Sequence, residues 1–207
     1  SGKCLGCSCS FGNVDNMIKQ IDNVPEKVLE YLKTGHGQDL INHNLVGQMQ
    51  KEFEYKDVPE YVSDFILRQT QDPMFTDHLA TLNILSSNKQ LYLQKLWINY
   101  QGKHEFNPVH HHSGVFSFII FLKIPYNLED EDKVFPKTGH DYNATSRLVF
   151  YMINQLGRIF DLPVHVDKSY EGKMLMFPSF VQHGVYPFYT SDDYRITVSG
   201  NISVNVE

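Results

Sequence analysis

The feature that most constrains the fold is a series of short β-rich segments that begins near residue 90 and continues to the end of the chain. These segments are rich in β-branched and aromatic residues, and stretches rich in glycine, proline and asparagine separate them. The expected strands are Leu91–Tyr100, Ser113–Pro125, Arg147–Ile153, Arg158–Val166, Gly172–Phe177 and Tyr194–Val206. Many short strands with turns between them predict a β-sandwich or a jelly roll.

The first ninety residues show a helical pattern instead. From about Val14 to Lys33, apolar residues recur at intervals of three and four, which predicts two helices divided by Pro25, with Asn23 capping the second. Residues 57–70 predict a further helix, and Leu79–Leu85 predict a short one. We therefore expect the N-terminal part to be mostly helical.

We expect a single domain over residues 1–207. In this domain a helical buttress over residues 14–90 would cover one face of a β core over residues 91–206. The predicted fold class is mainly β with N-terminal helices (α+β). The stretch Asn127–Ser146 is polar, acidic and long, and we expect it to be a flap over the mouth of a site or to be disordered.

The composition disfavours several classes of protein. A formal net charge of −6 argues against general nucleic-acid binding, which requires a basic face. No apolar run approaches the ~18 residues that a membrane span needs, and the start of the chain shows no signal-peptide pattern. The cysteines Cys4, Cys7 and Cys9 lack a clear fourth zinc ligand, so we expect reduced thiols in a terminal segment of a cytoplasmic protein.

A run of three histidines carries the first chemical signal. Successive side chains of a strand point to opposite faces, so His110 and His112 would point together while His111 points away. His183, from a separate strand, would supply a third imidazole. Three ligands on one side of a metal ion leave coordination positions open, which is what oxygen chemistry at Fe(II) requires.

The last expected strand adds an anchor for an anion. From Arg195 to Asn205 the odd positions are polar, and the even positions are apolar or glycine. Such a polar face either meets solvent or lines a cavity, and the position of Arg195 twelve residues after His183 favours the cavity. A guanidinium can hold a carboxylate through two parallel hydrogen bonds, and Ser199 shares its face. The pattern predicts an oxygen-activating iron enzyme that uses a 2-oxoacid.

Together these motifs resemble the Fe(II)/2-oxoglutarate-dependent oxygenase superfamily, in particular its prolyl-hydroxylase-like members and small oxygenases of phage and marine-bacterial type. The family motif is His-x-Asp/Glu, a distal His and a following Arg. It corresponds here to His110, His112, His183 and Arg195. The segment Gly172–Pro187 is also similar to the family's stretch around the distal histidine. The resemblance covers about residues 91–206 and implies a double-stranded β-helix, which is a cupin-like jelly roll.

The resemblance also implies cofactors and further site residues. Fe(II) would be the metal, 2-oxoglutarate and O2 would be cosubstrates, and ascorbate is a candidate reductant. Arg195 would pair with the far carboxylate of 2-oxoglutarate, helped by Ser199 or Tyr100. The segment Trp97–Gly102 is similar to the strand that precedes the first ligand in the family, so Asn99 is a further candidate.

His112 departs from the family pattern, because it stands where the family has a carboxylate. The exchange removes a negative charge and a hard oxygen ligand, although imidazole still suits iron. Three interpretations remain open. His112 is a ligand, or it lies near a metal held by His110, His183 and water, or the site is degenerate.

The expected function is hydroxylation of an unidentified substrate, with a prolyl, peptidyl or small-molecule compound as candidate and nucleic acid least favoured. Two alternatives remain open. One is a three-histidine cupin-like dioxygenase that needs no 2-oxoacid, and the other is a non-catalytic β-sandwich that acts as a binding or structural module. The expected location is the cytoplasm, or that of the host if the protein is phage-encoded. The sequence indicates no oligomeric state.

Overall fold

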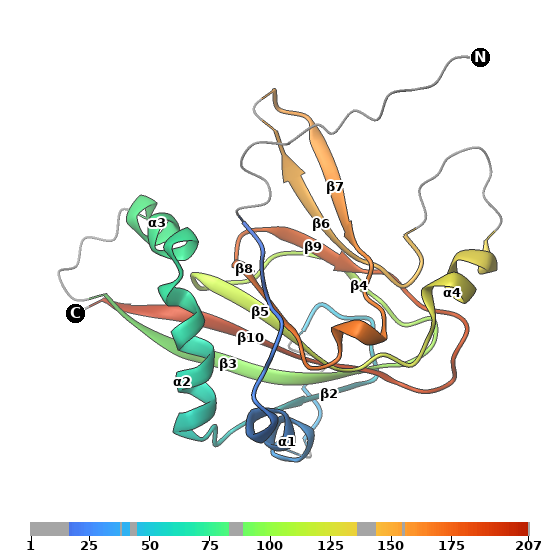
Figure 1. Cartoon of the computed structure of the whole chain (residues 1–207), viewed down its shortest axis with the longest axis horizontal. Coiled ribbons are helices and arrows are strands. Elements are labelled where there is room, and N and C mark those ends of the chain that lie inside the picture. The colour runs from blue at the N-terminus through green and yellow to red at the C-terminus, as the bar shows by residue number, and fades with distance from the viewer. Residues whose placement is uncertain are drawn as a thin grey trace.

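The computed structural model describes residues 17–37, 39–41, 45–82, 89–135, 144–154 and 156–206. Two antiparallel sheets form its framework (Figure 1). The six-stranded sheet has the order β1 (Lys19–Ile21), β8 (Met174–Pro178), β5 (Phe116–Lys123), β10 (Arg195–Val206), β3 (Lys89–Gln101) and β2 (Lys51–Glu54). The four-stranded sheet has the order β4 (Asn107–His110), β9 (Gln182–Val185), β6 (Leu148–Ile153) and β7 (Ile159–Val164).

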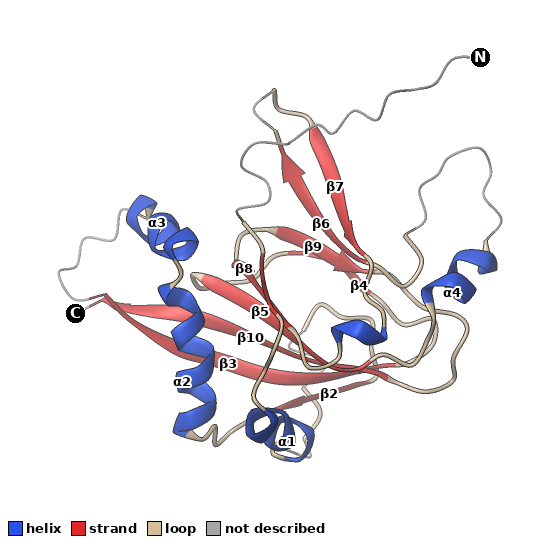
Figure 2. Cartoon of the chain, viewed as in Figure 1, coloured by secondary structure: helices blue, strands red, loops and turns tan. Residues whose placement is uncertain are grey.

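This architecture confirms the predicted fold class, which is mainly β with N-terminal helices and a jelly-roll core (Figure 2). Each of the six expected strands is present, as β3, β5, β6, β7, β8 and β10. The structure adds four shorter strands, β1, β2, β4 and β9, which have only three or four residues each. The histidine pattern predicts a strand at His110 and another at His183, without bounds, and no pattern in the sequence indicates β1 or β2. A segment of that length is too short to show a periodic pattern.

The N-terminal helices are α1 (Glu26–Thr34), α2 (Glu60–Arg68) and α3 (Pro73–Thr81). The expected helix before Pro25 is wrong in its described part, because Lys19–Ile21 form β1 and pair with β8 at the edge of the large sheet. Pairing with a neighbouring strand overrides local periodicity there. The cap of α1 is Pro25 rather than Asn23.

The expected short helix near Leu79 begins earlier than predicted. Asp72 caps α3 by accepting a hydrogen bond from the backbone N–H of Met74, and Pro73 occupies the first helical position. The predicted continuation over residues 83–85 lies outside the described residues. The first ninety residues are also less helical than expected, because they contribute β1 and β2 to the large sheet.

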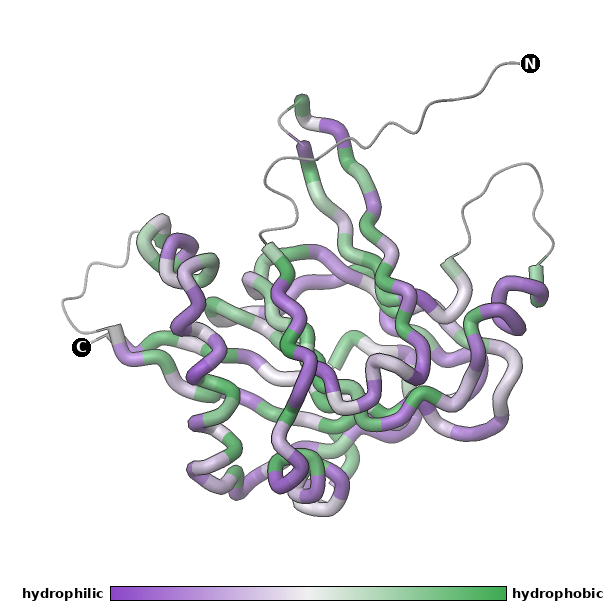
Figure 3. The backbone as a smooth tube through the Cα atoms, viewed as in Figure 1, coloured by the Kyte–Doolittle hydropathy of each residue, from purple (hydrophilic) through white to green (hydrophobic). Residues whose placement is uncertain are grey.

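Part of the polar stretch Asn127–Ser146 has regular structure, so the expectation of disorder is wrong for that part, and the expectation of a flap stays a prediction. Leu128–Val134 form the helix α4, and residues 136–143 lie outside the described part. The middle of α4 is hydrophilic (Figure 3), yet its Glu131 side chain is completely buried. This helix lies at the end of the barrel where β10 begins (Figure 1).

Two apolar clusters hold the layers together. The first joins the N-terminal helices to the large sheet, and its fully buried members are Leu32, Val62, Ile66, Phe75, Ile98, Phe116, Ile120, Met174, Met176, Val198 and Ile202. The second lies between the sheets, and its most buried members are Phe121, Leu148, Phe150, Val166, Phe177 and Phe188. β5 reads as a continuous apolar run because each of its faces meets one of these clusters. None of the helices in the described ranges has the length and apolarity of a membrane crossing.

Candidate functional site

Three imidazoles converge at the open end of the small sheet. The register of β4 and β9 places His110 directly opposite His183, with ring centroids 4.4 Å apart. His112 follows β4 on the same side, and its ring lies 4.8 Å from that of His110 and 5.1 Å from that of His183. One nitrogen of each ring lies within 4.8 Å of the others, so small rotations bring all three to one metal ion.

Hydrogen bonds select the ring nitrogen that faces the metal position. Nδ1 of His110 donates to the carbonyl of Pro108 at 2.7 Å, and Nδ1 of His183 donates to the carbonyl of Val181 at 2.9 Å. A carbonyl only accepts hydrogen bonds, so the proton of each ring is on Nδ1 and the lone pair is on Nε2. In metal sites, a hydrogen bond from the other ring nitrogen to a carbonyl orients a histidine ligand in this way.

The electrostatics keep these rings neutral. Burial, followed by repulsion from the neighbouring imidazoles, lowers the pKa of His112 to about 2 and that of His183 to about 3. Burial also lowers the pKa of His110. Metal ligation requires the neutral form of histidine, so all three are ready for a cation at neutral pH. The residues present therefore fit a divalent metal ion.

A pocket extends from the triad to the start of β10 and encloses about 490 Å³ of space, including solvent at its mouth. Besides the three histidines, its lining residues are Met49, Trp97, Asn99, Gln101, Asn107, Ile119, Val185, Arg195, Thr197 and Ser199. Three pairs in the β3–β10 register line it together, because Arg195 lies opposite Gln101, Thr197 opposite Asn99 and Ser199 opposite Trp97. These positions share one face of the large sheet.

Arg195 lies in the far wall of this pocket, and the residue as a whole is only 2% exposed. Nη1 donates to the carbonyl of Ser146 at 3.2 Å, while Nε is buried without a hydrogen-bond partner. Among the described residues, no carboxylate lies within ion-pair distance of this cation. A buried charge without a counter-charge is costly, so the pocket is suited to an anionic ligand.

Asn99 and Tyr100, which the sequence suggested as further contacts of the ligand, lie on opposite faces of β3. Asn99 faces the pocket, where its Nδ2 donates to Oγ of Ser199 at 3.1 Å and to Oγ1 of Thr197 at 3.3 Å. Tyr100 points to the opposite face, where its hydroxyl lies 3.1 Å from Nε2 of His36, and it does not line the pocket. Adjacent residues of a strand cannot share a face, so Asn99 and Tyr100 could not both reach one ligand.

Sequence reasoning missed several lining residues. Trp97 and Gln101 lie two positions either side of Asn99, and Thr197 lies between Arg195 and Ser199, so the period of two could have found them. Met49 and Asn107 also line the pocket, but they come from segments whose sequence shows neither strand nor helix periodicity. His111 is exposed, and its Nδ1 lies 3.1 Å from Nε2 of Gln182, outside the pocket. Cys4, Cys7 and Cys9 lie outside the described residues.

A family model described as "Putative 2OG-Fe(II) oxygenase" matches residues 95–201. No curated protein matches. A Pseudomonas putida prolyl-4-hydroxylase is similar in structure with a TM-score of 0.49 and 11% identity, over 90% of this chain and 91% of that one.

Two other solved structures are similar at comparable levels. A Trichoplax adhaerens prolyl hydroxylase, in complex with a hypoxia inducible factor peptide fragment, has a TM-score of 0.47 and 13% identity over 91% of this chain and 83% of that one. A Burkholderia pseudomallei oxidoreductase of the 2OG-Fe(II) oxygenase family has a TM-score of 0.41 and 13% identity. The alignment covers 76% of this chain and only 66% of the Burkholderia protein. The family model spans more than half of the 207 residues, so the chain belongs to the 2OG-Fe(II) oxygenase family of oxidoreductases, which use Fe(II) and 2-oxoglutarate.

Proposed function

We propose that this protein hydroxylates a peptidyl, prolyl or small-molecule substrate, with His110, His112 and His183 as ligands of Fe(II) and Arg195 as the anchor of 2-oxoglutarate. One observation carries the proposal. A buried guanidinium without a carboxylate partner shares a pocket with three neutral, converging imidazoles. A dianionic 2-oxoacid supplies the negative charge that both ends of this pocket need.

The histidines act through fixed geometry. Nε2 of His110 and Nε2 of His183 would be held toward the metal by the hydrogen bonds that their Nδ1 atoms donate to backbone carbonyls. His112 would complete the set, and the hydrogen bond from its backbone N–H to the carbonyl of Ser179 fixes its segment. When bound, Fe(II) and 2-oxoglutarate supply O2 activation coupled to decarboxylation of the cosubstrate to succinate and CO2.

Arg195 would bind the carboxylate of 2-oxoglutarate that lies farther from the metal. Its Nε has no partner in the described structure and is available for one of two parallel hydrogen bonds. Ser199 and Asn99 form the adjacent wall, where the hydroxyl of Ser199 can donate to the ligand while its oxygen accepts from Asn99.

Apolar residues close the remainder of the pocket. The ring of Trp97 lies 5.7 Å from that of His112, and Ile119 and Val185 also line the cavity. These side chains exclude water and lower the local dielectric, which strengthens the attraction between Arg195 and a carboxylate. Nucleic acid is the least favoured substrate because the net charge is −6.

A second candidate function is favoured by the ligand set itself. Among the described lining residues there is no carboxylate, and His112 stands at the position where the family motif has one. An all-histidine site is compatible with a dioxygenase that needs no 2-oxoacid. The role of Arg195 distinguishes the two candidates, because only the first needs a carboxylate anchor.

The test measures succinate formed from 2-oxoglutarate by the purified protein with Fe(II) and O2. We expect Arg195→Ala to lower this turnover by at least about a hundredfold, because a charge-assisted pair inside a dry pocket is lost. The control is Arg158→Ala, which removes an exposed arginine on the small sheet's hairpin and should leave turnover unchanged. Equal succinate formation by Arg195→Ala and the unmodified protein would refute the proposal.

A further inference from the structure

Ser146 has an unusual backbone conformation for its residue type. Its φ is +62°, in the left-handed region that residues other than glycine rarely adopt, and its side chain is completely buried. Such a conformation costs free energy and persists only where the surrounding structure imposes it. Ser146 lies two residues before β6, far from Arg195 in the sequence.

The carbonyl of Ser146 is what Arg195 contacts. Nη1 of Arg195 donates to it at 3.2 Å, and among the described residues this is the one hydrogen bond that the Arg195 side chain makes. The hydroxyl of Tyr126 donates to the same oxygen, also at 3.2 Å. The carbonyl of Ser146 is therefore the one hydrogen-bonding partner that orients the buried guanidinium, and the left-handed φ of Ser146 contributes to the direction of that carbonyl.

A second arginine, Arg147, binds the turn that contains Ser146. Nη1 of Arg147 donates to the carbonyl of Thr145 at 2.8 Å and to Oγ of Ser146 at 3.3 Å. Nη2 of Arg147 donates to Oδ1 of Asp132 on α4 at 2.7 Å. The backbone N–H of Ser146 donates to the carbonyl of Pro187 at 2.9 Å. The turn is thus tied both to α4 and to the connection that leads into β10.

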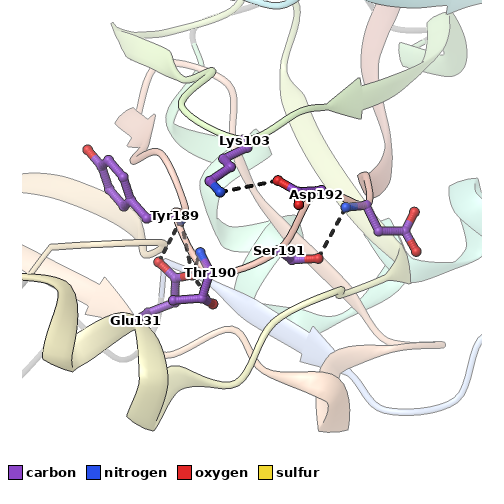
Figure 4. A network of polar contacts seen from close by, with 7 residues as sticks. Lys103, Glu131, Tyr189, Thr190, Ser191 and Asp192 are labelled. Atoms are coloured by element: carbon purple, nitrogen blue, oxygen red, sulfur yellow. Dashed lines mark hydrogen bonds and ion pairs between the residues drawn. The ribbon is translucent and has the colours of Figure 1, made fainter.

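The same helix is tied to that connection by its buried carboxylate (Figure 4). Glu131 accepts hydrogen bonds from the backbone N–H of Tyr189 at 3.0 Å and from the N–H and Oγ1 of Thr190 at 2.8 and 2.5 Å. Two adjacent residues of α4 therefore bind the two segments next to Arg195. Glu131 binds the segment that precedes Arg195, and Asp132 binds Arg147 beside the Ser146 turn.

We propose that the left-handed turn at Ser146 is a positioning element for 2-oxoglutarate, in which its carbonyl aims the guanidinium of Arg195 at the cosubstrate's carboxylate. This inference rests on the proposed function of Arg195. The turn acts through Arg195 and does not touch the ligand. Orienting a long, flexible side chain before binding removes an entropic cost from the binding step.

Two substitutions separate the carbonyl from the hydroxyl of Ser146. Ser146→Thr keeps the hydroxyl, but a β-branched residue resists a positive φ. Ser146→Gly loses the hydroxyl and adopts a positive φ freely. If the direction of the carbonyl is what matters, the threonine variant binds 2-oxoglutarate weakly and the glycine variant binds it nearly as well as the unmodified protein.

The binding assay uses the chain's single tryptophan. Trp97 lines the pocket beside His112, so its fluorescence reports on both the metal and the ligand. The full chain is loaded with Mn(II) and titrated with 2-oxoglutarate. We expect Ser146→Thr to raise Kd by at least about tenfold, as the loss of a hydrogen bond to a charged group would, and Ser146→Gly to raise it by less than about threefold. Affinity for Mn(II) alone should be unchanged in both variants.

Two less disruptive substitutions on α4 test the same role if Ser146→Thr does not fold. Asp132→Asn weakens the hold on Arg147 at a partly exposed site and should raise Kd for 2-oxoglutarate about threefold, by the loss of one charge-assisted bond. The control is Asp130→Asn on the exposed side of the same helix, which should leave Kd unchanged.

The outcomes are distinct. If the folded Ser146→Thr binds 2-oxoglutarate as the unmodified protein does, or if Ser146→Gly loses as much affinity as Ser146→Thr, the positioning role is overturned. With Ser146→Thr unfolded, equal Kd values for Asp132→Asn and Asp130→Asn overturn it. If the Mn(II)-loaded unmodified protein does not bind 2-oxoglutarate, the proposed role of Arg195 is refuted, and the positioning role of Ser146 is refuted with it.

Discussion

His110 and His183 lie directly opposite each other in the β4–β9 pair, and their rings are held in equivalent ways. Each Nδ1 donates to the carbonyl of the residue two positions earlier, Pro108 for His110 and Val181 for His183. The antiparallel register thus directs the Nε2 atoms of both rings toward the same point.

If both histidines bind the metal as proposed, this symmetry predicts that neither can be lost. We expect His183→Ala to weaken Mn(II) binding by at least about a hundredfold, because a site left with two imidazoles loses most of its chelation. The control is His111→Ala, which removes an exposed imidazole beside the same strands and should leave binding unchanged. Isothermal titration with Mn(II) measures both, and similar affinities for the two variants would contradict the assignment of the triad.

Restoring the family's carboxylate should change stability in opposite directions with and without metal. His112→Asp places a carboxylate among buried groups, so the metal-free variant should lose about 1–3 kcal/mol of unfolding free energy. The same negative charge attracts a cation, so Mn(II) should raise Tm more in this variant than in the unmodified protein. His112→Asn, with the same shape and no charge, is the matched control. If the Asp and Asn variants gain equally from Mn(II), His112 does not face the metal.

Acid should destabilise the metal-free protein through the same histidines. Burial holds the pKa of His112 at about 2 and that of His183 at about 3 in the folded state, below the ~6.5 of an unfolded chain. Below pH 6.5 the unfolded state therefore binds more protons, and folding loses about 1.4 kcal/mol per pH unit for each histidine until its folded pKa is reached. The contribution is complete above pH 6.5.

The measurement is urea unfolding of the metal-free protein between pH 7.5 and 5.5. We expect His112→Gln to reduce the loss of stability over this range by about 1 kcal/mol, because one depressed pKa is removed. His111→Gln should leave the slope as it is, since that ring is exposed. Identical slopes for His112→Gln and the unmodified protein would show that His112 is not held neutral by burial.

The long strands could be predicted from sequence because alternation is a local property. The same period placed His110 with His112, and Arg195 with Ser199. It also should have separated Asn99 from Tyr100, which point to opposite faces of β3. Of these two candidates, only Asn99 therefore lines the pocket.

The remaining features depend on contacts between distant segments. Lys19–Ile21 follow a helical spacing but pair with β8, because an open sheet edge offers them hydrogen bonds. Glu131 gives no local signal of burial within an acidic run, and only the folded chain brings the N–H groups of Tyr189 and Thr190 to it. The left-handed φ of Ser146 is likewise imposed by partners far away in sequence.

The buried carboxylate of Glu131 should make a large contribution to stability. Glu131→Gln keeps the shape but replaces one acceptor oxygen with an NH2 group that faces the donors of Tyr189 and Thr190. We expect a loss of about 2–3 kcal/mol in the free energy of unfolding, as for hydrogen bonds to a charged group. Glu129→Gln, the same substitution at an exposed position of α4, should cost less than about 0.5 kcal/mol. Urea unfolding at pH 7.5 compares the two, and a loss for Glu131→Gln no greater than that for Glu129→Gln would mean that the network around α4 does not support the fold.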